Sequence, residues 1–186
     1  MRRALRGVYA RTIAAAPSDT ISVLDRGEAI AFSFADLMKY HGPGSPGGVA
    51  QAFKVLQRAL PLLAPDGPPE RREIALRTSF GGPGARDGFE YVTRAVSEDR
   101  YAVDAGLERH DLPRTRARFV FRVTYRDRAA TLTLREGFVT EEFMDALAHD
   151  DRTPKQEADL TRLKGELADR VMAASAEEVY EAVTEG

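Results

Sequence analysis

The alternation of apolar and polar residues along the chain predicts two long amphipathic helices. Apolar residues recur every three or four positions after residue 48, and Pro61 helps to end this first helix. The second helix starts at Pro154, a favourable residue for a first helical turn. The apolar positions are Val49, Ala52, Phe53, Leu56, Ala59, Leu60 and Leu63 in the first helix, and Leu160, Leu163, Leu167 and Val171 in the second.

Shorter helices are predicted between and around these two. Ser33 is the predicted N-cap of a helix that leads to residue 41, and Ser175 is the predicted N-cap of a last helix over residues 176–185. The remaining helices are predicted over residues 2–15, 89–99 and 140–150.

Strict alternation of apolar and polar residues predicts strands in two regions. Ile74, Leu76 and Thr78 share one face of the first strand. Residues 119–125 and 129–135 form two further runs around an Arg-Asp-Arg turn, which predicts an antiparallel hairpin with one buried face. We therefore expect an α+β fold in one structural domain, with helices packed on a mixed or antiparallel sheet. Its core spans residues 1–150, and residues 151–186 add a C-terminal helical extension.

Two Gly-Pro-Gly loops carry the candidate binding chemistry. The sequences are YHGPGSPGGVAQAF (residues 40–53) and GGPGARDG (residues 81–88), and each leads into a predicted helix. Free N–H groups and the positive end of the helix dipole favour an anion at such a position. If the loops converge, they can bind one carboxylate or phosphate between them. The expected lining is Gly42, Gly44, Ser45, Gly47, Gly48, Gly82, Gly84, Arg86, Asp87 and Tyr91.

Each loop residue also has a purely structural interpretation. The glycines alone can supply positive φ angles and close packing. His41 is suited to proton transfer, because histidine titrates near neutral pH, but it can equally bond a carbonyl at a helix C-terminus. Glu90 is a candidate general base or an inert exposed glutamate, and Asp87 is a candidate helix N-cap. Because both loops carry such groups, we expect a pocket, with His41 and Glu90 as candidate catalytic residues.

Composition and charge narrow the function classes. The chain of 186 residues has no cysteine, which excludes disulfides, thiolate metal sites and cysteine nucleophiles. The net charge of −2 gives no basic field for nucleic acid, although Arg109, Arg114, Arg116 and Arg118 form a local set that suits an acidic group or a solvated strand edge. No apolar run suits a membrane span or the core of a signal peptide. We therefore expect a cytoplasmic protein without nucleic-acid or membrane partners.

The order of these motifs resembles the FmdE family, which is named for a component of formylmethanofuran dehydrogenase. The first loop falls where that family carries His-Gly-His-x-Cys-Pro-Gly, and ARDGFEYVTRA falls where it carries an Asp-(Ala/Gly)-(Ile/Val)-Gln run before Gly-Cys. The paired strands and the C-terminal PKQEADLTRLKGELADRVMAASAEEVYEAV also match, so that the resemblance covers most of the chain. It implies an FmdE-like α+β core, a homodimer and, in many members, a metal held by the first loop.

The departures from the family pattern bear on that metal. Pro43 and Ser45 stand where the family has its second histidine and its cysteine. His41 would need Glu90, Asp87 or a group of a partner subunit to complete three or four ligands. The resemblance thus implies a binding protein for a small anionic metabolite with a degenerate metal site, in which a divalent metal at His41 is less expected than none. The open alternatives are an enzyme that uses His41 for acid–base chemistry, and a structural or interaction subunit.

Overall fold

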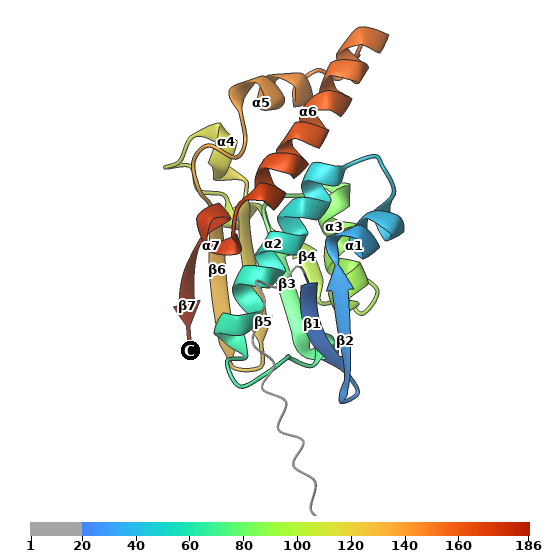
Figure 1. Ribbon diagram of the computed structural model, residues 1–186. Coiled ribbons are helices and arrows are strands. Elements are labelled where there is room, and N and C mark those ends of the chain that lie inside the picture. The colour runs from blue at the N-terminus through green and yellow to red at the C-terminus, as the bar shows by residue number, and fades with distance from the viewer. Residues whose placement is uncertain (1–19) are drawn as a thin grey trace, which may run out of the picture.

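The computed structural model describes residues 20–186, so the helix predicted over residues 2–15 lies outside the described part of the chain. Its strands form a five-stranded sheet and a separate hairpin, with helix α2 crossing one face of the sheet (Figure 1). The strands are β1 Thr20–Asp25, β2 Glu28–Ser33, β3 Ile74–Thr78, β4 Tyr101–Val103, β5 Val120–Tyr125, β6 Arg128–Leu134 and β7 Tyr180–Glu185. The α-helices are α1 Phe34–His41, α2 Pro46–Leu63, α3 Pro83–Thr93, α4 Arg114–Ala117, α5 Glu141–Leu147, α6 Pro154–Ala173 and α7 Ala176–Val179. The 3-10 turns η1 and η2 cover Arg71–Glu73 and Ala105–Leu107.

The sheet is mixed and has the order β4-β3-β5-β6-β7. Strand β4 runs parallel to β3, and every other neighbouring pair is antiparallel. The predicted hairpin is present as β5 and β6, in which Phe121 pairs with Leu132 and Val123 with Ala130. The buried side chains of β3 are those of Ile74, Leu76 and Thr78, as its alternation predicts. The α+β class expected from the sequence is confirmed.

Helix α2 is the centre of the molecule. It packs against α3, α6 and the inner face of the sheet, and all of its predicted apolar positions are buried. Pro61 lies inside the last turn, and the helix ends two residues later. The buried stripe of α6 also has the predicted residues, and α6 extends past the end of the sheet (Figure 1). None of the helices within residues 20–186 combines the length and the apolar run that a membrane crossing needs.

The hairpin β1–β2, which the apolar pattern does not predict, is fastened to the end of α3 by a buried arginine. The side chain of Arg71 is 5% exposed. Its Nε donates to the carbonyl of Val92 over 2.7 Å, its Nη2 to that of Tyr91 over 2.5 Å, and its Nη1 to Asp25 at the hairpin turn over 3.4 Å. Its guanidinium group also lies over the ring of Phe32. One side chain thus joins β1, β2 and α3.

The helix predicted over residues 176–185 is wrong beyond its first turn. A capping box between Ser175 and Glu178 starts α7 as expected, but the chain then extends and pairs with β6 as strand β7. Tyr180 is buried, whereas Glu181 and Val183 are exposed, as befits an edge strand with one face toward the core. Pairing with β6 outweighs the helical preference of the Glu- and Ala-rich sequence. The expected helical extension over residues 151–186 is therefore helical only to Val179, and it contributes a strand to the sheet.

Candidate functional site

Both glycine loops form the first turns of neighbouring helices. Pro46 and Pro83 occupy the first positions of α2 and α3, where proline is favourable. Helix α3 therefore starts six residues before the predicted start at Phe89. Among the glycines of the two loops, only Gly42 has a positive φ angle, +82°. Conformational freedom therefore accounts for Gly42 and not for the other loop glycines.

The other glycines allow α2 and α3 to touch at their N-termini. A Cβ atom on Gly84 would overlap the carbonyl oxygen of Ser45, and one on Gly48 would lie 2.9 Å from the backbone nitrogen of Ala85. Neither helix has a side-chain N-cap or an acidic residue in its first turn. The partial positive charges at two helix N-termini in contact repel each other, and an anion placed between them offsets this repulsion.

A cavity of about 350 Å³ opens at this junction. Two cationic side chains line it: Lys164, whose Nζ donates to the carbonyl of Gly44 over 3.2 Å, and Arg118. The guanidinium group of Arg118 is exposed and has no hydrogen bond or ion pair within residues 20–186. The apolar walls come from α5, α6 and the residues just before β5 and just after β3, and consist of Phe80, Phe119, Phe143, Met144, Leu147 and Leu167.

The expected pocket lining divides into two groups. Five of the predicted residues line the cavity, all of them at the helix starts: Ser45, Gly47, Gly48, Gly82 and Gly84. The others lie outside it: Gly42, Gly44, Arg86, Asp87 and Tyr91. Tyr91 stacks on Tyr40 with 5.0 Å between ring centroids, and Arg86 is half-exposed and lies 3.5 Å from Asp87. The cavity thus lies at the first turns of α2 and α3, and the second turn of α3 and the start of the first loop do not line it.

Lys164 and the apolar walls are not predicted by the sequence pattern, and Arg118 is predicted only as one of a set. The other three arginines of that set have partners: Arg109 pairs with Asp111, Arg114 pairs with Glu141 and Asp145, and Arg116 donates to the carbonyl of Leu134. Leu167 is predicted only as a core position of α6. No spacing in the sequence brings α5 and α6 to the glycine loops, since their contact depends on the tertiary fold.

His41 and Asp87 form a hydrogen-bonded pair beside the cavity rather than in it. His41 ends α1, and its Nδ1 lies 2.8 Å from Oδ2 of Asp87. The histidine side chain is 9% exposed, and its Nε2 has no partner within residues 20–186. The alternative of a carbonyl partner for His41 is therefore wrong, as is the N-cap role of Asp87, because α3 starts earlier than predicted. The carboxylate orients the ring, and Nε2 is shielded from solvent.

Glu90 is a buried structural anchor in this fold. Its carboxylate accepts hydrogen bonds from the backbone N–H groups of Val96 and Ser97, over 2.8 and 3.0 Å, and from the Ser97 hydroxyl over 2.7 Å. Burial acts to raise the pKa of Glu90, but the hydrogen bonds from Ser97 and Val96 outweigh it and hold the pKa below its ordinary value of 4.5. The prediction of an inert exposed glutamate is wrong, and the carboxylate oxygens are already occupied.

We expect the substitution Glu90→Gln to destabilise the protein in a pH-dependent manner. Because the folded-state pKa lies below the unfolded one, the native state binds fewer protons, and the stabilisation by Glu90 is present above pH 4.5 and is lost as the pH falls through the folded pKa. Urea unfolding of both proteins should give a difference in free energy that is largest at neutral pH and shrinks in acid. Glu136→Gln at an exposed position is the control. An equal difference in unfolding free energy at neutral and at acidic pH would contradict the stabilising role of the ionised Glu90 carboxylate.

The donors present do not fit a transition-metal site at the first loop. Within residues 20–186, no three His, Asp or Glu side chains gather closely enough to hold a metal ion. Asp87 already engages Nδ1 of His41, and Glu90 is bonded to Val96 and Ser97. One imidazole with one carboxylate falls short of the three or four protein ligands that such a site requires.

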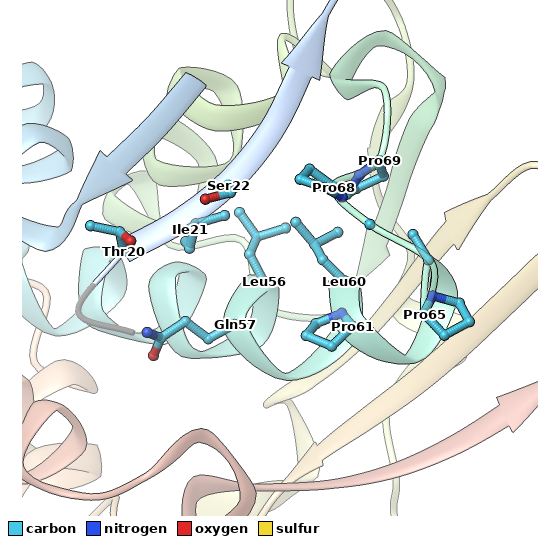
Figure 2. A pocket seen from close by; sticks show the side chains of 12 residues that line it. Thr20, Ile21, Ser22, Leu56, Gln57, Leu60, Pro61, Pro65, Pro68 and Pro69 are labelled. Atoms are coloured by element: carbon cyan, nitrogen blue, oxygen red, sulfur yellow. The ribbon is translucent and has the colours of Figure 1, made fainter. Parts of the chain in front are cut away.

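A second cavity, of about 320 Å³, lies between β1, the end of α2 and the loop at residues 64–69. Figure 2 shows Leu56 and Leu60 extending from α2 toward β1 and toward Pro68. Its lining has no charged side chain. The cavity at the helix N-termini therefore suits the expected anionic ligand better.

No protein-family model matches the chain, and no curated protein matches it. The function is accordingly inferred from the geometry of the site.

Proposed function

We propose that this protein binds a small anion with an apolar body in the cavity between α2, α3, α5 and α6. The observation that carries the proposal is the convergence of two uncapped helix N-termini on a cavity that Arg118 and Lys164 also line. The helix ends and the two cations favour a carboxylate or phosphate. The phenylalanine, methionine and leucine walls favour a hydrocarbon body.

The size and composition of the cavity agree with this ligand class. Its volume of about 350 Å³ is at the lower end of small-molecule sites, which are mostly apolar with a few placed polar groups. A branched short-chain acid such as isocaproate therefore suits it, with the carboxylate at Gly47 and Gly84 and the alkyl chain against Phe119 and Leu167.

Binding of isocaproate, its neutral amide and isopentyl phosphate tests the proposal by calorimetry. We expect both anions to bind and the amide to bind at least tenfold more weakly. Lys164→Met and Arg118→Met should each weaken anion binding about five- to tenfold, since a hydrogen bond to a charged group contributes about 1.5–3 kcal/mol when buried and less when exposed. Lys155→Met on the same helix α6, outside the cavity, should leave binding unchanged. Equal binding of acid and amide would contradict the proposal.

The resemblance to the FmdE family supports the same proposal, since members of that family carry ligand chemistry on the first loop. With it we propose a homodimer, which a sedimentation measurement tests. We also propose a cytoplasmic location, supported by the absence of cysteine.

A second candidate function is acid–base catalysis by His41. The observation in its favour is the hydrogen bond to Asp87 together with the unpartnered Nε2, since a carboxylate that orients the ring prepares the other nitrogen for proton transfer. Turnover of a small-molecule substrate that is lost in His41→Asn, while the protein stays folded, would establish this role.

A further inference from the structure

The side chain of Leu147 lies at the outer edge of the cavity at the helix N-termini. Three residues of α5 line this cavity: Phe143, Met144 and Leu147. Phe143 is 7% exposed and belongs to the hydrophobic core, whereas Leu147 is 37% exposed. Because both side chains line the same cavity, this difference places Phe143 in its interior and Leu147 at its mouth.

Phe143 and Leu147 form one continuous apolar strip along α5. They are four residues apart, and residues at this spacing share one face of a helix. The rise between them is about 6 Å. The strip therefore extends the buried apolar wall outward by a little more than one helical turn, and its outer end reaches the solvent.

Polar contacts fix the orientation of α5, so that Leu147 is presented at the mouth. Arg114 of α4 pairs with Glu141 and Asp145, over 2.5 and 2.7 Å. These two acids share the face of α5 that is opposite to the apolar strip. At the other end of the helix, Nη2 of Arg152 donates to the carbonyl of Leu147 over 3.0 Å. Contacts on the polar face and at the C-terminal end thus hold the apolar strip toward the cavity.

The exposure of Leu147 differs from that of an isolated surface residue. Single exposed apolar side chains are common and need no explanation. Val183 on β7 is such a case, since it is exposed and lies outside the cavity. Leu147 instead continues a buried apolar wall at the opening of a candidate ligand site. A hydrocarbon that covers it on binding removes apolar surface from water, which favours the complex.

The volume of the cavity also accommodates a longer hydrocarbon than that of isocaproate. At about 30 Å³ for each water-sized group, a cavity of about 350 Å³ holds roughly eleven such groups. Isocaproate has fewer non-hydrogen atoms than this. Octanoate, a straight-chain acid with two more carbons, comes closer to that number and can extend from the interior to the mouth.

We infer that the ligand is a medium-chain carboxylate whose tail follows Phe143 outward and covers Leu147, so that Leu147 determines the preferred chain length. The carboxylate stays at the N-termini of α2 and α3, and only the end of the tail reaches the mouth. The inference rests on the proposed function, because it assigns the outer end of the same ligand.

Hexanoate and octanoate test the inference, since they differ only in the length of the tail. The measurement is the ratio of their dissociation constants, hexanoate over octanoate, by calorimetry. We expect a ratio of about ten in the wild type, because each buried methylene group strengthens binding roughly fourfold. Leu147→Ser should lower the ratio to about three or less, and Leu147→Met should restore most of it, since methionine again covers the end of the tail.

Val183→Ser is the matched control, because it removes an exposed apolar side chain outside the cavity. It should leave the ratio unchanged. The same ratio in the wild type and in Leu147→Ser would overturn the inference and leave the proposed function standing.

A measurement on the wild type alone covers the case in which Leu147→Ser fails to fold. At saturation, the methyl resonances of Leu147 should shift strongly with octanoate and much less with hexanoate. Shifts of equal size with both acids, or with neither, would overturn the role of Leu147. Failure of both acids to bind would overturn the proposed function, and the inference with it.

Discussion

Replacement of Arg71 by alanine should lower the free energy of unfolding by about 3–5 kcal/mol, the usual cost of breaking a buried ionic network. The truncation leaves the carbonyls of Tyr91 and Val92 without their donors and removes one of the two arginines that hold Asp25. It also opens a space below the ring of Phe32. The hairpin β1–β2 would lose its main polar connection to α3.

Urea unfolding checks this expectation against a neighbouring arginine. Arg72→Ala removes a side chain that also bonds Asp25 and Glu98 but is 38% exposed. We expect a much smaller loss for Arg72→Ala, because exposed ion pairs contribute little. Equal losses in the two variants would mean that the buried hydrogen bonds of Arg71 do not hold the hairpin.

Gly84→Ala should cost about 1–3 kcal/mol or more and abolish ligand binding. The added Cβ would overlap the carbonyl oxygen of Ser45 and lie 3.0 Å from the backbone nitrogen of Val49. Both obstacles include backbone atoms, which cannot turn aside as a flexible side chain does, so that α2 and α3 must separate. Separation of the two helix ends would disperse the N–H groups that we assign to the anion.

Gly165→Ala is the matched control for this substitution. Gly165 lies within α6, and an added Cβ would meet no atom within 4 Å. Alanine should therefore stabilise the helix, by up to about 1 kcal/mol. Thermal unfolding measures the two changes in stability, which we expect to have opposite signs, and isocaproate binding is the second readout. A Gly84→Ala protein of wild-type stability would contradict the close contact of the helices.

Local sequence patterns predict the elements whose own residues determine them. Four such features are predicted correctly, because each depends on residues close together in the sequence. They are the apolar stripe of α2, the cap of α1 at Ser33, the alternation in β3 and the β5–β6 hairpin. Strand β7 is not, since the pairing of Tyr180 and Ala182 with β6 decides its conformation. The hairpin β1–β2 also escapes prediction, although Arg26 and Gly27 form a tight turn with positive φ angles.

The site is predictable only at its helix ends. Gly47, Gly48 and Gly84 stand out because a cluster of glycines at the start of a helix is uncommon, and they do line the cavity. Lys164 and Phe143 belong to α6 and α5, far along the chain, and only the tertiary packing brings them to Ser45.

The most direct test of the binding proposal is an NMR titration of the labelled protein with isocaproate. We predict that the largest shifts occur at the backbone amides of Gly47, Gly84 and Ala85, and that they disappear with the neutral amide. Shifts confined to Leu56, Leu60 and the loop at residues 64–69 would place the ligand in the second cavity. That result, or the absence of any saturable shift, would contradict an anion site at the joined N-termini of α2 and α3.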